Sequence, residues 1–304
     1  MSLFITQALN GLTYGVLLFL LAAGLTLVLG IMNFVNLAHG SLYMMGAYFA
    51  ASAYASTGSF WLAGLIAVPA TLVLGIVIER VALLPLYSRD HLDQVLGTFG
   101  LILFFNELAR IIWGPTALYM NAPDALSGTI SLLGLDYPSY RFLIIVVGLA
   151  VGAGLYLLIH RTRVGMLIRA GATHAEMVAA LGINIRLLNT LVFGLGAGLA
   201  GLAGLMIGPI ASIESGMGDR ILILTLVVIV VGGIGSIRGA FYAALMIGVI
   251  DTVGRIFLPR LLRELATQSV ADAAGPALAS MLIYLLMAIV LAVRPQGLFP
   301  VRHS

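Results

Sequence analysis

The sequence contains no cysteine and no lysine, so all 15 of its basic residues are arginine. The absence of cysteine excludes disulfides and thiolate metal sites. The absence of lysine excludes a Walker A motif, whose lysine contacts nucleotide phosphates, and it also excludes Schiff-base chemistry. If this protein uses the energy of ATP, another chain must therefore bind the nucleotide.

Charge of either sign is scarce. Only 9% of the 304 residues are charged, whereas 61% are hydrophobic, and the mean hydropathy is +1.12. A soluble domain of this length could not bury so much apolar surface, so the composition predicts a polytopic integral membrane protein. The formal net charge is only +3, and the arginines lie mainly at the ends of apolar segments. This pattern fits the positive-inside rule better than nucleic-acid binding.

Long apolar runs define the expected membrane segments. We expect no cleavable signal peptide, because residues 1–8 lack a basic region and the run from Leu9 to Met32 is long enough to span a bilayer. The prediction is an all-α fold of about eight to nine transmembrane helices in one membrane domain, residues 1–304. The second segment is short and begins with polar residues, which favours a broken or re-entrant helix. The predicted segments lie near residues 9–31, 40–56, 60–78, 94–113, 141–159, 189–209, 220–237, 240–258 and 277–293.

The placement of arginine predicts the orientation. With the basic segment 160–188 inside, the N-terminus falls outside and the C-terminus inside. The loop from Gly114 to Tyr140 contains no arginine, which suits the outer face. The arginines expected inside are Arg80, Arg89, Arg161, Arg163, Arg169, Arg186, Arg238, Arg294 and Arg302. Those expected outside or near the outer ends are Arg110, Arg141, Arg220, Arg255, Arg260 and Arg263.

The basic segment 160–188 contains a self-contained helix signal. Thr173 followed by Glu176 has the spacing of a capping box, and Gly182 predicts a C-terminal stop. The helix between them, near residues 174–181, would be only ~12 Å long and marginally stable alone in water. An external partner is therefore expected to hold it.

This short helix has an apolar face formed by Met177, Ala180 and Leu181. An apolar helical face that docks into a groove is a known mode of recognition, so the pattern predicts a docking site for a soluble partner. The alternative is an ordinary connection whose arginines only set the topology.

The sequence N-F-V-N-L-A-H-G at residues 33–40 places polar side chains between apolar segments. One interpretation is a helix break near a translocation path, where amides meet a zwitterionic substrate. The alternative is an interfacial turn of ordinary polarity. His39 has no second ligand at helical spacing, so no metal site is expected.

Two glycine-rich segments, residues 194–208 and 232–239, are interpreted as structural features. Between residues 194 and 208 glycines recur at three- and four-residue spacing, which predicts close helix packing, with a ligand-facing role as the minor alternative. The sequence G-G-I-G-S-I-R-G at 232–239 fails the dinucleotide-binding spacing and lacks a βαβ context. It predicts a tight cytoplasmic turn.

Two pairs of opposite charge have helical spacing within apolar segments. Glu107 and Arg110 are three residues apart, and Asp251 and Arg255 are four apart, so each pair shares a helical face. Self-neutralising pairs near the membrane edge are favoured, and proton coupling through Asp251 is the alternative. The sequence has no G-x-S-x-G or H-E-x-x-H motif, so an intramembrane enzyme is disfavoured.

Taken in order, these motifs resemble the ABC-transporter permeases for branched-chain amino acids, of the LivH/LivM type. Residues 165–184 resemble the coupling loop of that family, and the likeness includes residues 33–40, 194–204 and 232–239. The positions that match the coupling-loop pattern are Gly165, Arg169, Ala170, Glu176, Ala179, Gly182, Ile183 and Asn184.

The resemblance implies a non-enzymatic permease subunit of an ATP-driven importer of branched-chain amino acids in a bacterial inner membrane, with no cofactor or metal of its own. It implies a second, similar permease subunit, two cytoplasmic ATPase subunits and an extracytoplasmic substrate-binding protein, and no nucleic acid. The residues expected to couple to the ATPase are Gly165, Arg169, Ala170, Thr173, Glu176, Met177, Ala180, Leu181 and Gly182. The residues expected along the translocation path are Asn33, Asn36, His39, Gly40, Gly232 and Gly233.

Several alternatives stay open. Arg169 would either pair with acidic residues of the ATPase or only reach the membrane interface. Related permeases carry urea or short amides, so the substrate is not fixed by the sequence. A secondary transporter driven by an ion gradient through the two charge pairs is the competing class.

Overall fold

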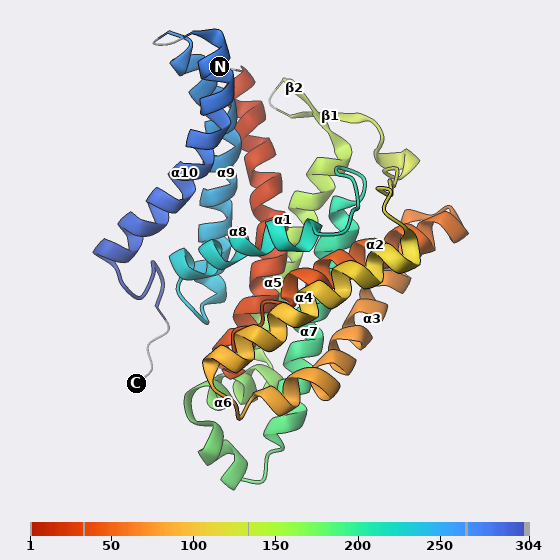
Figure 1. Cartoon of the computed structure of the whole chain (residues 1–304), viewed down its shortest axis with the longest axis vertical. Helices are drawn as coiled ribbons and strands as arrows, with labels where there is room; N and C mark the ends of the chain where they lie inside the picture. Colours follow the sequence, from red (N-terminus) through yellow and green to blue (C-terminus); the bar gives the residue numbers. More distant parts are fainter. Residues whose placement is uncertain (1, 33, 133, 265–266, 301–304) are drawn as a thin grey trace.

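The computed structural model describes residues 2–32, 34–132, 134–264 and 267–300, and most of these residues lie in ten α-helices (Figure 1). The helices are α1 (Ser2–Met32), α2 (His39–Thr57), α3 (Phe60–Ile78), α4 (His91–Trp113), α5 (Ser139–Arg161), α6 (Arg163–Ala180), α7 (Ile185–Ile207), α8 (Met217–Gly232), α9 (Ile237–Leu262) and α10 (Gln268–Val293). Shorter elements are η1 (Glu79–Leu83), η2 (Leu84–Leu86), η3 (Asp124–Leu126) and an antiparallel hairpin of β1 (Thr129–Leu132) and β2 (Leu135–Pro138).

Within the described residues, seven helical segments are long and apolar enough to cross a membrane. They contain α1, α3, α4, α5, α7, α9 and α10. This confirms the all-α membrane fold, but it does not confirm eight to nine spans. Two of the nine predicted membrane segments, which correspond to α2 and α8, are not among these seven helical segments. At 16 residues α8 is about 24 Å long, shorter than the ~30 Å hydrocarbon layer, and it runs across the middle of the molecule (Figure 1).

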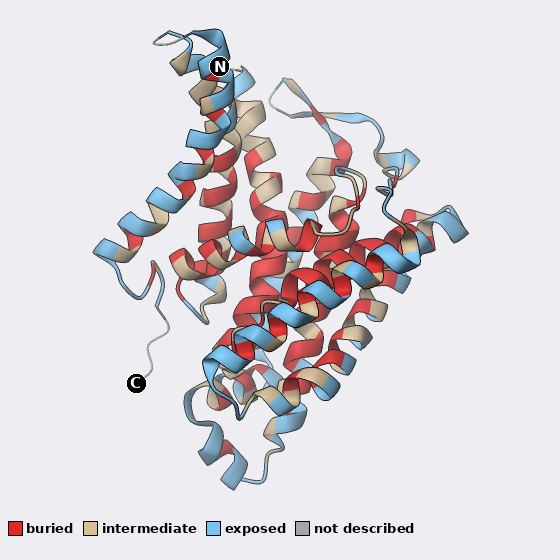
Figure 2. Cartoon of the chain, viewed as in Figure 1, coloured by how far each residue is buried: buried red, intermediate tan, exposed pale blue. Residues whose placement is uncertain are grey.

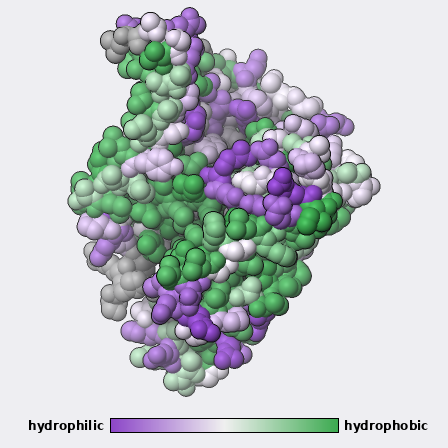
Figure 3. All heavy atoms as spheres, in the orientation of Figure 1, coloured by the Kyte–Doolittle hydropathy of each residue, from purple (hydrophilic) through white to green (hydrophobic). Residues whose placement is uncertain are grey.

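The centre of the bundle is formed by α1 and α7. In each, 78% of the most apolar window is buried, whereas α4, α5 and α10 bury 22% or less (Figure 2). The outer helices expose large apolar side chains such as Leu65 and Ile111. Hydrophobic residues cover the middle of the molecule, and hydrophilic residues gather toward its ends (Figure 3). This is the surface expected of a protein with a lipid-facing belt.

Glycine allows the central helices to approach closely. A Cβ at Gly204 of α7 would overlap the Tyr43 carbonyl oxygen of α2 and lie 2.7 Å from the Ala47 nitrogen. A Cβ at Gly46 of α2 would lie 2.5 Å from the Gly201 Cα of α7, so only glycine allows the two backbones to approach this closely. The packing interpretation of the glycine-rich run is therefore confirmed.

The helical structure is interrupted between α1 and α2, as the sequence predicted. Residues 34–38 are not helical, and the Asn36 side-chain oxygen accepts a hydrogen bond from the Ala38 nitrogen at 3.0 Å. Asn33 lies outside the described residues. Asn36 is 1% exposed and His39 is fully buried, so the break is packed within the protein.

The N-terminal end of α1 and helix α6 lie at opposite ends of the molecule (Figure 1). The turn at residues 233–236 joins α8 to α9, and Gly235 packs on Gly30 near the C-terminal end of α1. The predicted tight turn at 232–239 is therefore present, and it lies toward the α6 end.

Candidate functional site

Helix α6 lies at one end of the molecule and joins α5 to α7. The Thr162 hydroxyl caps its first turn by accepting a hydrogen bond from the Gly165 nitrogen at 3.0 Å. Gly165 is buried against the last turn of α5, where a Cβ would overlap the Leu158 and Ile159 carbonyl oxygens. Any larger residue at 165 would push α6 away from α5.

The predicted capping box at Thr173 is wrong. The Thr173 hydroxyl donates to the Arg169 carbonyl oxygen at 3.0 Å, so it completes the preceding turn and does not cap the next one. The non-helical residue is His174, with φ −144° and ψ 72°, and it divides α6 into two helical parts. Glu176 is exposed and makes no capping bond.

The C-terminal stop at Gly182 is confirmed. Gly182 has φ +84°, its nitrogen donates to the Ala179 carbonyl oxygen at 2.9 Å, and the Ile183 nitrogen donates to the Val178 carbonyl oxygen at 3.4 Å. This is a Schellman motif, in which a left-handed residue satisfies the last carbonyls of the helix. Asn184 then caps α7 by accepting from the Leu187 nitrogen at 3.0 Å, so only a short, hydrogen-bonded turn separates α6 from α7.

The second part of α6 presents an apolar face to the exterior. Met177 is 62% exposed, Leu181 is 77% exposed, and Ala180 is also exposed, whereas Val178 is buried against the protein. Helix α6 itself lies at the end of the molecule opposite the N-terminal end of α1 (Figure 1). The structure thus brings together the three residues that the sequence assigned to a docking face.

Arg169 and Ala170 lie on the first part of α6. The Arg169 guanidinium donates to the Ile159 carbonyl oxygen at the end of α5, where the helix dipole is negative. Ala170 is half-buried. Arg169 therefore ties α6 to α5, a role that neither sequence alternative included.

The candidate path residues lie in closely packed regions. Gly40 meets Gly218 at the start of α8, and a Cβ at either position would overlap the other backbone. Gly232 packs on Gly239, and Gly233 packs on the segment after α10. The protein has cavities of about 580 Å³ and about 1260 Å³, and none of the described candidate path residues lines either of them. Their role in translocation stays a prediction.

Polar groups nevertheless collect near the break. The Thr26 hydroxyl, the Asn36 side-chain nitrogen and the Ser41 hydroxyl are buried and have no hydrogen-bond partner among the described residues. Buried polar groups without partners are costly, which sets this region apart from the surrounding core.

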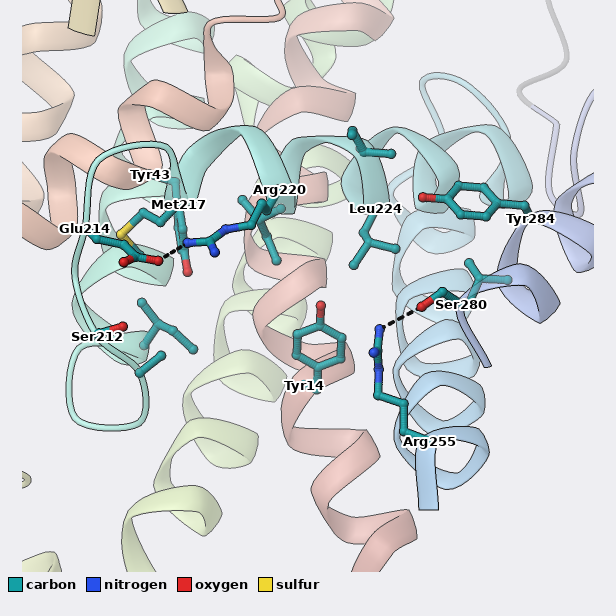
Figure 4. A pocket seen from close by; sticks show the side chains of 15 residues that line it. Tyr14, Tyr43, Ser212, Glu214, Met217, Arg220, Leu224, Arg255, Ser280 and Tyr284 are labelled. Atoms are coloured by element: carbon teal, nitrogen blue, oxygen red, sulfur yellow. Dashed lines mark hydrogen bonds and ion pairs between the residues drawn. The ribbon is translucent and has the colours of Figure 1, made fainter. Parts of the chain in front are cut away.

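A cavity of about 580 Å³, here called the outer cavity, opens between α1, α8, α9, α10 and the loop after α7 (Figure 4). Residues in the N-terminal half of α1 and the C-terminal half of α9 line it, and these halves lie away from α6 (Figure 1). Its polar side chains are Tyr14, Tyr43, Ser212, Glu214, Arg220, Arg255, Ser280 and Tyr284. This cavity was not predicted from the sequence, because six separate segments build it and only Asp251–Arg255 gave a signal. The segments are α1, α2, the end of α7 with the loop after it, α8, α9 and α10.

A second cavity of about 1260 Å³ lies between α1, α5, α6 and the turn before α9. His160, Arg169 and Arg238 face it, and its described lining contains no carboxylate. The Arg238 guanidinium carbon lies 4.9 Å from the centre of the Tyr156 ring, and that ring stacks on His160 at 4.4 Å. The end of the molecule that contains α6 is therefore basic.

Glu79 is a buried charge that the sequence analysis did not identify. It lies in η1, is 1% exposed, and accepts hydrogen bonds from the Thr190 hydroxyl at 2.9 Å and the Tyr87 hydroxyl at 3.1 Å. Arg80 lies 3.6 Å away. Burial, and then the Glu79 carboxylate, raise the pKa of Tyr87 above its usual value. These contacts fasten the end of α3 to the first turns of α7.

Comparison with known proteins supports one family. A family model described as the branched-chain amino acid transport system permease component matches residues 7–291. The chain is 32% identical to the high-affinity branched-chain amino acid transport system permease protein BraD of Pseudomonas aeruginosa, over 97% of this chain and 95% of that protein. It is 29% identical to the LivH permease protein of Salmonella typhimurium and 28% identical to that of Escherichia coli K12, in each case over 84% of this chain and 87% of the relative. The chain belongs to the family of branched-chain amino acid transport system permease components, and it is a multi-pass membrane protein.

Proposed function

We propose that this chain is the membrane permease subunit of an ATP-driven importer that carries branched-chain amino acids across a bacterial inner membrane. The observation that carries the proposal is the match of residues 7–291 to a family of permease components, together with relatives whose names specify branched-chain amino acids. The chain itself is a transport subunit and not an enzyme. Since it contains no lysine for a Walker A motif, the ATP is bound by separate subunits.

The docking face on α6 receives the ATPase. Met177, Ala180 and Leu181 form an exposed apolar surface on α6, and an apolar helical face of this kind suits a groove on a partner protein. In this proposal α6 lies in the cytoplasm and the N-terminal end of α1, at the opposite end of the molecule, lies outside. The placement of arginine predicts that the C-terminus is inside.

Movement of α6 would be transmitted through α7. The turn at Gly182 to Asn184 is short and hydrogen-bonded, so the two helices are closely linked. Glu79 links the beginning of α7 to α3, and the glycines of α7 contact α2 directly behind the helix break. A displacement at the ATPase therefore reaches the break at residues 34–38 through packed helices, as expected for a coupling device.

The complete importer would contain a second, similar permease subunit, two ATPase subunits and an extracytoplasmic binding protein. The basic α6 end, with His160, Arg169 and Arg238, fits the cytoplasmic side by the positive-inside rule. The outer cavity is lined by the halves of α1 and α9 that lie away from α6, which in this proposal is the side from which a binding protein delivers substrate.

Uptake into proteoliposomes tests the transport class. The chain and its partner subunits are reconstituted, and labelled leucine uptake is measured with ATP and with ionophores that dissipate proton and sodium gradients. Uptake that requires ATP and continues with the ionophores supports the proposal. Uptake that stops with the ionophores and does not require ATP would instead support the ion-coupled class.

A further inference from the structure

The outer cavity contains an ion pair within membrane-spanning helices. In α9, the Arg255 Nε donates to the Asp251 carboxylate at 2.8 Å, and the Asp251 side chain is only 7% exposed. Arg255 Nη2 donates to the Ser280 hydroxyl of α10 at 3.1 Å. Arg255 faces the cavity and is 44% exposed, and among the described residues its Nη1 has no hydrogen-bond partner (Figure 4). A charged group in a membrane span that opens on a cavity is a candidate functional group.

Three tyrosines from three helices line the same cavity. Tyr14 comes from α1, Tyr43 from α2 and Tyr284 from α10, and the hydroxyl of each makes no hydrogen bond within the described residues. Tyr14 points toward the space beside the Arg255 guanidinium (Figure 4). A self-neutralising ion pair needs no such hydroxyls around it. Their convergence with an unused guanidinium nitrogen indicates a site that receives a polar ligand.

The opposite wall supplies a charge of the other sign. Glu214, in the loop before α8, forms an ion pair with Arg220 in the first turn of that helix, and its side chain is 40% exposed (Figure 4). Its carboxylate faces the cavity and can accept further hydrogen bonds. The cavity thus offers a cation and an anion on separate walls.

Apolar side chains complete the lining. Ile207, Met217, Ile221, Leu224 and Ile283 line the cavity between the polar groups. The volume of about 580 Å³ lies within the range of small-molecule sites, which is roughly 300–1,000 Å³. An aliphatic side chain of moderate size fits this lining better than a second polar group.

We propose that the outer cavity binds an aliphatic amino acid by its carboxylate, with Arg255 and Tyr14 at that group and the apolar lining at the side chain. This inference rests on the proposed function, and it assigns to the permease a site of its own for the substrate. Urea or a short amide has no carboxylate for Arg255 to bind, so the site discriminates against them.

Photolabelling tests the site in the complete transporter. The purified complex in nanodiscs is irradiated with a diazirine analogue of leucine that keeps the ammonium and carboxylate groups, and the labelled peptides are mapped by mass spectrometry. We expect labels on the walls of the cavity, in α8 and α10. Leucine should compete with this labelling, whereas leucinamide, which lacks the carboxylate, should compete poorly.

Two variants and a control make the test specific. Arg255→Gln should reduce the labelling roughly tenfold or more, because it removes a charge-assisted hydrogen bond, and Tyr14→Phe about two- to tenfold. Tyr14→Phe removes a hydroxyl that has no partner, so it leaves the fold intact. The control is Arg263→Gln, because Arg263 pairs with Asp272 outside the cavity.

The outcomes separate this inference from the function on which it rests. Normal leucine uptake with no saturable labelling of the cavity, or with labelling that is unchanged in both Arg255→Gln and Tyr14→Phe, would overturn the binding site and leave the importer intact. If the wild-type complex takes up no leucine, the proposed function itself fails, and the site fails with it.

Discussion

Leu181→Asp is expected to release the ATPase without unfolding the permease. Leu181 is 77% exposed at the C-terminal end of α6, so its replacement should change the free energy of unfolding of the isolated chain by less than about 0.5 kcal/mol. Full burial of a leucine side chain contributes about 1.5–3 kcal/mol. Scaled by the exposed fraction, the lost contact amounts to about 1.2–2.3 kcal/mol, or a roughly 7- to 50-fold weaker affinity. The cost of burying a carboxylate makes this a lower bound.

The assay is binding of fluorescently labelled ATPase subunit to the permease in nanodiscs, with thermal unfolding recorded on the same samples. Tyr119→Asp is the matched control, because Tyr119 is 75% exposed and lies in the loop between α4 and β1. It should bind the ATPase as the wild type does. Unchanged ATPase affinity in Leu181→Asp would refute the docking face on α6, and so would an equal loss in Tyr119→Asp.

The remaining predictions concern the packed centre and the links to α6. Gly204→Val should lower the melting temperature, because overpacking costs about 1–3 kcal/mol, whereas Gly100→Ala, with nothing within 4 Å of the added Cβ, should not. Gly182→Ala places a side chain at φ +84°, which costs about 1–2 kcal/mol, so amide hydrogen exchange at the end of α6 should accelerate. Unchanged protection of these amides from exchange would contradict the Schellman motif. Glu79→Gln should destabilise the fold by about 1–3 kcal/mol in thermal unfolding, and a neutral result would show that the carboxylate is not needed. Because the pKa of Tyr87 is raised in the folded state, its contribution to stability is complete below about pH 10 and declines above it, so Tyr87→Phe should make the loss of stability above about pH 10 smaller in a pH series.

Local sequence signals predicted much of the architecture. The hydropathy pattern predicted the membrane class, and the polar residues at 33–40 predicted the helix break. The spacing of glycines in 194–208 predicted close packing, and Gly182 predicted the end of α6. Each of these features depends on neighbouring residues in one segment, and such features are accessible to pattern analysis.

Other features were predicted wrongly or were missed. The capping box was wrong because the Thr173 hydroxyl donates to the carbonyl oxygen of the previous turn, a local competition that residue spacing does not resolve. Residues 220–237 were expected to span the membrane, but the helix ends at Gly232 and lies across the bundle, since glycine contacts at both ends fix it there. The outer cavity and the contact between Glu79 and Thr190 join residues more than 100 positions apart, and no periodicity in the sequence reveals such pairs.

The central claim is best tested by uptake of labelled leucine into cells that express this chain with its partner transport subunits, with unlabelled urea as the competitor. The account predicts ATP-dependent leucine uptake that excess urea leaves unchanged. If leucine does not enter, or if urea abolishes its uptake, the assignment to branched-chain amino acids is contradicted in favour of a permease for urea or short amides.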